Sequence, residues 1–350
     1  MKQPLVNIVI ITCNQFEFIS ACLESLFDCG YPNLLVYLVD NNSNAKEYQK
    51  FYYKYRDNKM LVFSRLPKNI GFAGGCNHAL KKIKSGYIVF LNDDTIVTKN
   101  WLNPIITYME NNPEVGACQP KIKNMRNKDY FEYAGAGGGY MDVFGFPFCR
   151  GRIFVDIEKD QGQYDDIVDV VWTSGNCMIT KAEVIRKVGM LDEIFFIYGE
   201  EADLCWRMFF HGYRLVYIPN SVVYHYGSGT MKNFVFKKIF LHHRNGLILL
   251  IKNYTITELI KYLPVRIFLD FIALFYYAYH NKNLKHPFVV IFAYLNLIYL
   301  LPRILKRRRE GAFRKNVNKL KYPLFKKSIV LESYVFRKKK FSKLQYFKYS

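Results

Sequence analysis

The chain has 350 residues, of which 51% are hydrophobic and 17% are aromatic. This composition excludes a disordered chain and a collagen-like or low-complexity architecture, since such chains lack the apolar residues needed for a core. The length suits roughly two domains, or one large domain with an appendage.

Positive charge is concentrated toward the carboxyl end. The chain holds 50 Lys and Arg against 29 Asp and Glu, a formal net charge of +21. Residues 303–350 contain 17 of the basic residues and only two acids, a net +15, so residues 1–302 carry only +6. A basic segment favours an anionic partner, and on charge alone both nucleic acid and anionic lipid are open.

The first ninety residues alternate between strands and helices. Val6–Ile11 is a mostly apolar, β-branched run that predicts a buried strand, and residues 15–28 have apolar side chains at helical spacing. The alternation continues with strands over 34–39, 61–64 and 87–91, and with helices ending near 55 and 84. Short links between these elements predict a doubly wound, mostly parallel α/β sheet.

Polar clusters follow three of these strands, at residues 12–14, 40–43 and 92–95. In doubly wound sheets, ligands bind at the carboxyl ends of the strands. We therefore expect the three clusters to converge on one crevice.

The segment from about 112 to 230 is less regular. It predicts a glycine-rich loop over 135–139, short strands and two helices; the strands are expected over 169–172, 177–180, 215–218 and 221–224, and the helices over 181–190 and 200–211.

Three apolar stretches follow, Leu247–Ile251, Ile267–Tyr279 and Phe288–Leu301, and a polybasic run comes directly after the third. No stretch reaches the roughly 18–20 apolar residues that a simple spanning helix needs. The pattern favours interfacial or re-entrant helices, and the alternative is a soluble helical subdomain with a basic face.

Carboxylates at a strand end can hold a divalent cation, which in turn holds phosphate oxygens. Asn92-Asp93-Asp94 fits that chemistry, although an acidic pair taken alone is usually a solvated turn or a helix cap. His225 also follows a predicted strand, where it is either a metal ligand or a structural histidine.

Two further segments suit a nucleotide. Asp40-Asn41-Asn42-Ser43 can read a base edge or ribose hydroxyls, or it can be ordinary turn chemistry. The glycines of Gly71–Asn77 let the backbone approach a ribose or diphosphate, although the segment is neither a Walker motif nor GxGxxG and can be a flexible loop.

Three carboxylates open the helix predicted over 200–211. Glu200 and Glu201 crowd one another, which raises carboxyl pKa values and suits a general base. Asp203 and Arg207, four residues apart, are spaced to pair on one helix face. The alternative is an acidic bias that complements the helix dipole.

Taken in order, these segments resemble the inverting family 2 glycosyltransferases of the GT-A fold, and most of all the rhamnosyltransferase-like subgroup of bacterial surface polysaccharide synthesis. The resemblance covers about residues 5–250. The segments that carry it are Val9-Ile-Ile-Thr-Cys-Asn14, Val39-Asp-Asn-Asn-Ser43, Asn69-Ile-Gly-Phe-Ala-Gly-Gly-Cys-Asn77, Leu91-Asn-Asp-Asp-Thr95, Trp172-Thr-Ser-Gly175, Phe196–Arg207 and His225-Tyr-Gly-Ser228.

The resemblance implies a Rossmann-like α/β fold with a mostly parallel central sheet and a role for each matching residue. The donor nucleotide would be bound by Thr12, Asn14, Asp40, Asn42, Gly71, Phe72, Ala73, Asn77, Asn92 and Asp93. Asn92-Asp93-Asp94 corresponds to the DxD metal motif with Asn in the first acidic position, so Mn²⁺ or Mg²⁺ would be held by Asp94 and His225. The donor sugar and acceptor would be lined by Trp172, Gly175, Asp203 and Arg207. The catalytic base would be Glu201 or Glu200.

The expected domains are a catalytic GT-A domain over 1–230, a helical, membrane-interfacial region over 231–310 and a basic tail over 311–350. The implied reaction moves a sugar from dTDP-rhamnose or a UDP-sugar to a hydroxyl of a lipid-linked glycan. The expected location is the cytoplasmic face of the plasma (inner) membrane, as a peripheral or monotopic protein on its anionic surface. The alternatives are a sugar nucleotidyltransferase, whose glycine-rich, Arg- and Lys-containing signature residues 10–20 lack, and a basic nucleic-acid-binding protein, for which no fold signature is present.

Overall fold

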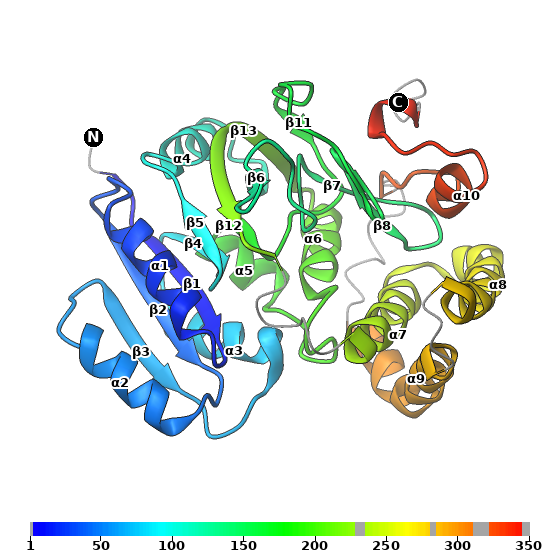
Figure 1. Ribbon diagram of the computed structural model, residues 1–350, viewed down its shortest axis with the longest axis horizontal. Coiled ribbons are helices and arrows are strands. Elements are labelled where there is room, and N and C mark those ends of the chain that lie inside the picture. Colours follow the sequence, from blue (N-terminus) through cyan, green and yellow to red (C-terminus); the bar gives the residue numbers. More distant parts are fainter. Residues whose placement is uncertain (1–2, 228–234, 281–284, 311–321, 345–350) are drawn as a thin grey trace.

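A computed structural model describes residues 3–227, 235–280, 285–310 and 322–344. An α/β domain holds the amino-terminal two thirds of the chain, and three long helices lie together beside it (Figure 1). The expected Ser228 end of the last matching segment and parts of the basic tail, 311–321 and 345–350, lie outside the described residues.

The central sheet has nine strands in the order β11-β13-β6-β12-β4-β1-β2-β3, with β5 paired to β13. Its first half is parallel, as predicted, with β1 between β2 and β4 and with β3 at the edge. These elements are β1 Val6–Thr12, α1 Phe16–Phe27, β2 Leu34–Asp40, α2 Ala45–Tyr55, β3 Leu61–Arg65, α3 Gly71–Leu80 and β4 Tyr87–Asn92. Strands buried on both faces explain the continuous apolar runs in the sequence.

The second half of the sheet is mixed. β12 runs antiparallel to both β4 and β6, whereas β13 runs parallel to β6 with register shifts along the pair. The strands expected separately over 215–218 and 221–224 form the single strand β13, because the irregularity after Ile218 does not end the pairing. The elements are β5 Thr95–Val97, α4 Leu102–Asn111, β6 Val115–Asn124, β11 Val168–Asp169, β12 Cys177–Lys181, α5 Ala182–Val188, α6 Glu200–Phe210 and β13 Arg214–His225.

The middle of the chain forms a small antiparallel sheet of four strands, in the order β10-β9-β8-β7. Its strands are β7 Gly139–Met141, β8 Pro147–Cys149, β9 Arg152–Ile153 and β10 Asp156–Ile157. Strands of two or three residues have too few side chains to show alternation, so the sequence pattern did not predict this sheet.

The carboxyl-terminal region consists of α7 Val235–Asn253, α8 Ile256–His280 and α9 Lys285–Glu310. Helix α9 corrects the expectation that no stretch is long enough to span a membrane. Its segment Phe288–Glu310 has a mean hydropathy of 2.0 over 18 residues, and among the described residues it is the one helix that is long and apolar enough by length and composition. The helix continues through Pro302, past the point where the apolar run was expected to end.

Residues 322–344, expected as part of a basic tail, fold back onto the small sheet. Tyr322 stacks on Trp206 of α6, with ring centroids 4.3 Å apart. Phe325 donates its backbone N–H to Met141, and Phe341 packs against Tyr140 at 4.9 Å. This segment also contains the short helix α10, Ile329–Tyr334.

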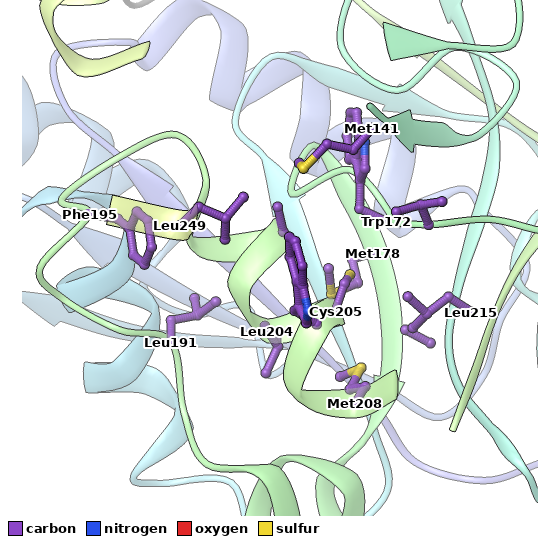
Figure 2. Packing of buried hydrophobic residues seen from close by; sticks show 14 of the residues in the cluster. Met141, Trp172, Met178, Leu191, Phe195, Leu204, Cys205, Met208, Leu215 and Leu249 are labelled. Atoms are coloured by element: carbon purple, nitrogen blue, oxygen red, sulfur yellow. The ribbon is translucent and has the colours of Figure 1, made fainter. Parts of the chain in front are cut away.

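One large core joins α6 to its surroundings. Figure 2 shows Leu204 and Cys205 of α6 between Phe195 and Leu249 on one side and Met178 and Leu215 on the other. Phe195 precedes α6, and Leu249 lies on α7, so the carboxyl-terminal helices share their core with the α/β domain.

Candidate active site

The strand ends bring the three predicted polar clusters together. Thr12 at the end of β1 pairs in register with Asp40 at the end of β2, and its neighbour Ile11 pairs with Asn92 of β4. The clusters at 12–14, 40–43 and 92–95 therefore meet at one edge of the sheet, as predicted for parallel strands. Thr12 is buried, and its hydroxyl interacts with the carboxyl of Asp93.

Asp40 occupies a buried position at one end of this crevice. Its carboxylate accepts the Ser43 backbone N–H at 3.2 Å and pairs with the Arg65 guanidinium at 3.2 Å. Asn14 and Asn42 beside it are exposed and have left-handed backbone conformations, with φ of 58° and 68°. Asn tolerates that conformation better than most residues, and its amide can hydrogen-bond a base or ribose.

The Gly71–Asn77 segment forms the beginning of α3 and contacts the loop before α6. Gly71 has φ +78°, and a Cβ atom there would lie 2.4 Å from the Phe196 carbonyl oxygen, so only glycine fits. Ala73 is buried and donates its N–H to the same carbonyl at 3.2 Å. Asn77 is also buried, and its amide bonds to Leu191 and Glu193, so it braces α3 against this loop.

Asp94 and His225 lie side by side. β5 follows Asp94 and pairs with the end of β13, which places His225 Nε2 2.8 Å from Asp94 Oδ1. Asn92 Nδ2 is 3.3 Å from the same ring nitrogen. Neighbouring Asp93 is buried, and burial together with the Asp94 charge raises the pKa of Asp93 to about 7.

Glu132, which the sequence analysis did not predict, lies at the other ring nitrogen of His225. Its Oε2 lies 3.4 Å from His225 Nδ1, and both side chains are buried. Burial alone would lower the pKa of His225, but the Asp94 and Glu132 carboxylates more than offset that and raise it to about 10. Glu132 lies in irregular chain between β6 and β7, so no strand-end rule indicated it.

The donor set fits a divalent cation of the kind that shares its coordination with phosphate. Within the described ranges, no three His, Cys, Asp or Glu side chains form a group able to hold a metal alone. Mg²⁺-type sites, however, commonly use one or two protein ligands together with substrate phosphates. An imidazole with one nitrogen toward Asp94 and the other toward Glu132 has the carboxylate–histidine arrangement that orients a ligating histidine.

Glu200 and Glu201 open α6, directly after Gly199 in the left-handed conformation with φ +94°. Glu200 is buried, and its Oε2 has no hydrogen-bond partner within the described structure. Burial, and then the Glu201 charge, raise the pKa of Glu200 well above the ordinary value, and burial also raises the pKa of Glu201. The predicted crowding of the two carboxyls is therefore present.

Gly175 and Phe72 flank Glu201. A Cβ atom at Gly175 would lie 3.6 Å from the Glu201 Cβ and 3.7 Å from the Phe72 ring, so a second strand-end segment lies against the acidic pair. Trp172 is buried near Gly175 in the sequence, and its indole N–H donates to the Tyr140 carbonyl at 2.7 Å. Glu201 Oε2 accepts the Gly199 N–H at 2.9 Å.

Asp203 and Arg207 form the predicted pair, with Arg207 Nε 3.0 Å from Asp203 Oδ2. Both are buried, and Asp203 also pairs with Lys252 of α7 at 2.8 Å. Arg207 donates to the carbonyls of residues 188–190. In this structure the two residues tie α6 to α7, and their assignment to the sugar or acceptor stays a prediction.

Solved structures share this fold. GalNAc-T7 with UDP, GalNAc and Mn²⁺ has a TM-score of 0.53 at 16% identity over 71% of this chain and 47% of its own. Staphylococcus aureus TarS 1–349 with UDP-GlcNAc has a TM-score of 0.53 at 15% identity over 89% of this chain and 88% of its own. The mannosyltransferase PcManGT from Pyrobaculum calidifontis, with GDP-Man and Mn²⁺, has a TM-score of 0.50 at 15% identity over 91% and 89%. The architecture is the GT-A fold.

Proteins of similar sequence narrow the class of protein further. Residues 7–170 match the family model described as glycosyl transferase family 2. The rhamnosyltransferase WbbL of Escherichia coli is 28% identical over 49% of this chain and 67% of its own, and the O-antigen biosynthesis protein RfbC of Myxococcus xanthus is 24% identical over 65% of this chain. The N-acetylglucosaminyl-diphospho-decaprenol L-rhamnosyltransferase of Mycobacterium tuberculosis is 22% identical over 69% of this chain and 83% of its own.

The match to RfbC spans only 18% of that protein's length. Over residues 7–170 the chain is therefore similar to family 2 glycosyltransferases, and its relatives include enzymes of cell-surface polysaccharide and O-antigen synthesis.

Proposed function

We propose that this protein is an inverting glycosyltransferase that moves a sugar from a nucleoside-diphosphate donor to a hydroxyl group of a lipid-linked glycan. The donor is dTDP-rhamnose or a UDP-sugar, and the product enters cell-surface polysaccharide or lipopolysaccharide assembly. The names of the relatives from E. coli and M. tuberculosis support rhamnose as the first sugar to test and a lipid-linked acceptor.

One observation carries the proposal: the segment 175–176 contacts both the crowded pair of glutamates and the strand end that holds the carboxylate–histidine pair. Asp94 and His225 lie at the ends of β4 and β13, while Glu200 and Glu201 open α6. Gly175 lies against Glu201, and Asn176 accepts the Asn92 N–H at 2.9 Å and the Thr95 hydroxyl at 2.7 Å. A phosphate-binding side and a proton-accepting side are the two parts that sugar transfer from a nucleotide needs.

The nucleotide occupies the β1–β2 side. Asn14 and Asn42 offer amides at the surface of the crevice, and Asp40, held by Arg65, offers a carboxylate to the base or ribose. Thr12 contributes a hydroxyl at the end of β1. Backbone beginning at Gly71 approaches the diphosphate, because no side chain stands there.

Asp94 and His225 would hold Mn²⁺ or Mg²⁺ together with the donor diphosphate, and Glu132 would fix the imidazole ring. When bound, the cation supplies positive charge to the departing diphosphate. Asn92 in place of an acid removes one negative charge from this side.

On the other side, Glu201 accepts the proton of the acceptor hydroxyl. The freed oxygen attacks the anomeric carbon from the face opposite the diphosphate, the bond from that carbon to the phosphate oxygen breaks, and the nucleoside diphosphate leaves with the electron pair. A single displacement of this kind inverts the anomeric configuration. The Gly199 N–H bond to Glu201 Oε2 directs the carboxylate while the other oxygen takes the proton.

The proposed location is the cytoplasmic face of the plasma (inner) membrane, as a peripheral or monotopic protein, and exposed apolar residues of α8 and α9 support a membrane contact. Phe268, Phe271 and Phe275 of α8 are 63%, 59% and 68% exposed, and α9 adds Phe292 and Ile298 at 59% and 66%. Contiguous apolar surface of this extent marks a membrane or protein contact. The Arg and Lys residues at the end of α9 favour anionic lipid as that contact.

The test is a donor panel of dTDP-rhamnose, UDP-GlcNAc, UDP-Gal and GDP-Man, each with Mn²⁺ or Mg²⁺. A thermal shift selects the donor, and transfer to N-acetylglucosaminyl-diphospho-polyprenol is followed by mass spectrometry and NMR of the product. We expect metal-dependent stabilisation by one donor and a product of inverted anomeric configuration. Retained configuration, or formation of a nucleotide sugar from sugar phosphate and nucleoside triphosphate, would overturn the proposal.

A further inference from the structure

The turn that leads into α6 has an unfavourable backbone. Phe196 and Tyr198 have φ of 67° and 71°, in the left-handed region that residues other than glycine rarely adopt. Gly199 follows at φ 94°. Two such conformations at residues other than glycine, within three residues, persist only when the surroundings impose them. Residues 196–199, which we term the pre-α6 turn, therefore need an outside constraint.

An amide on α7 supplies several of the bonds that hold this turn, beside the stacking of Tyr198 on His242 of the same helix. Asn245 Nδ2 lies 3.0 Å, 2.9 Å and 2.6 Å from the carbonyl oxygens of Phe195, Ile197 and Tyr198. Asn245 is 2% exposed, so water does not replace these bonds. Its NH₂ group therefore bonds to the backbone directly before the turn and at two residues within it.

Arg244 sets the orientation of that amide. Its Nε donates to Asn245 Oδ1 at 2.9 Å, which leaves the Asn245 NH₂ group facing the turn. A second guanidinium nitrogen, Nη2, donates to the Phe195 carbonyl at 2.9 Å. Arg244 also reaches Asn296 of α9, since its Nη1 lies 3.4 Å from Asn296 Oδ1.

The turn contacts both sides of the crevice. Gly199 donates its N–H to Glu201 Oε2 at 2.9 Å, and Phe196 accepts the Ala73 N–H at the beginning of α3 at 3.2 Å. A change in the turn would therefore shift the proton-accepting carboxylate and the donor segment relative to each other.

We propose that Asn245 is a positioning residue for sugar transfer: its amide, oriented by Arg244, imposes the left-handed pre-α6 turn and so fixes the Glu201 carboxylate against the donor segment. The inference rests on the proposed function, in which Glu201 is the base. On this inference a residue of α7, outside the α/β domain, positions the catalytic carboxylate. Arg244 connects this residue to the apolar helix α9.

The test compares Asn245→Ala with Asn253→Ala in the full-length protein. Asn253 is a matched control, because it is a buried α7 asparagine that bonds to Asp203 at 2.9 Å and not to the turn. With the donor selected in the panel, we expect Asn245→Ala to lower kcat about a hundredfold with little change in donor KM, since misplacement of about 1 Å has that effect. Nucleoside diphosphate affinity, measured by calorimetry with dTDP and UDP, should stay near the wild-type value.

A displaced carboxylate also changes its surroundings, so the acid limb of the kcat profile should move in Asn245→Ala and stay in place in Asn253→Ala. If Asn245→Ala does not fold, Arg244→Lys decides the matter, because it keeps the charge but loses the Nε bond that orients the amide. Equal kcat and pH profiles in the Asn245 or Arg244 variant and the Asn253 control would overturn the positioning role. Wild-type transfer by Glu201→Gln would instead overturn the base assignment itself.

Discussion

Glu200 and Glu201 are two carboxyls in one buried place, and only a deprotonated one can accept a proton. Burial raises the pKa of both groups, and the charge of one further raises the pKa of the other. A raised carboxyl pKa means that the protonated, inactive form persists to a higher pH. We therefore expect kcat/KM to fall as pH is lowered through a value above about 4.3, the ordinary pKa of Glu.

The measurement is kcat/KM against pH with the donor selected in the panel, with circular dichroism at each pH to show that the protein stays folded. An acid limb at the ordinary Glu pKa would contradict the assignment of this pair as the base.

Glu132 is expected to act through His225. A carboxylate on the far nitrogen of a ligating histidine orients the ring, and its loss typically weakens metal binding by about 10- to 100-fold. Glu132→Gln should therefore raise the Mn²⁺ dissociation constant by that factor in calorimetry with UDP or dTDP present. Glu158→Gln is a control, since Glu158 bonds to Tyr164 and not to His225. Unchanged Mn²⁺ affinity in Glu132→Gln would show that Glu132 does not orient His225 for metal binding.

At the level of single residues, the sequence predicted those that follow parallel strands. Thr12, Asp40 and Asp94 meet because the strands are parallel and adjacent, which apolar periodicity already indicated. Glu132 and Asn245 could not be predicted this way. One lies in irregular chain and the other in a helix, and their contacts with His225 and the pre-α6 turn depend on long-range packing that no local pattern encodes.

At the scale of the elements, buried ion pairs and hydrogen bonds connect α6 to α7. Asp203 of α6 bonds to Arg207 on its own helix and to Lys252 and Asn253 of α7. Burial would raise the pKa of Asp203, but Lys252 and Arg207 outweigh it and lower the value to about 2. Because the folded-state pKa is below the unfolded value of about 3.9, this contribution to stability is present above that pH and is lost as pH falls toward 2.

Asp203→Asn should therefore destabilise the protein by about 3–5 kcal/mol near neutral pH, since it removes the carboxylate that pairs with buried Arg207 and one of the two that pair with Lys252. Urea unfolding measures this, with Glu114→Gln as control, because Glu114 and Arg214 form an exposed pair that contributes little to stability. A variant of wild-type stability with a raised donor KM would instead support the predicted contact of Asp203 with the sugar.

The elements predicted best were those with long apolar runs. The alternation of strands and helices from β1 to β4 closely follows the prediction, because the central strands β1 and β4 are buried on both faces and give continuous apolar runs. The packing of residues 322–344 on the small sheet was not predicted. Tyr322 and Phe341 contribute single aromatic contacts within a basic segment, and such contacts have no period.

At the scale of the whole molecule, the proposed function with a lipid-linked acceptor requires a surface that faces the membrane. We expect the full chain to bind vesicles containing phosphatidylglycerol and to be released by salt, because part of the attraction is between Lys or Arg and anionic lipid. Replacing Phe268, Phe271 and Phe275 together with Ser should weaken binding more than tenfold, at about 1.5–3 kcal/mol per buried side chain.

The control is Val155→Ser, which removes an exposed apolar residue, at 77% exposure, from the small sheet. Sedimentation with vesicles of phosphatidylglycerol and phosphatidylethanolamine measures the difference. Equal binding by the triple variant and the control would show that α8 is not the contact.

The most direct test of the central claim is the rate of sugar transfer by Glu201→Gln, measured beside the wild type at saturating donor and acceptor. General base catalysis contributes about 100- to 10,000-fold, so the account predicts a loss of that size while dTDP or UDP still binds with wild-type affinity. Transfer by Glu201→Gln at the wild-type rate would contradict it.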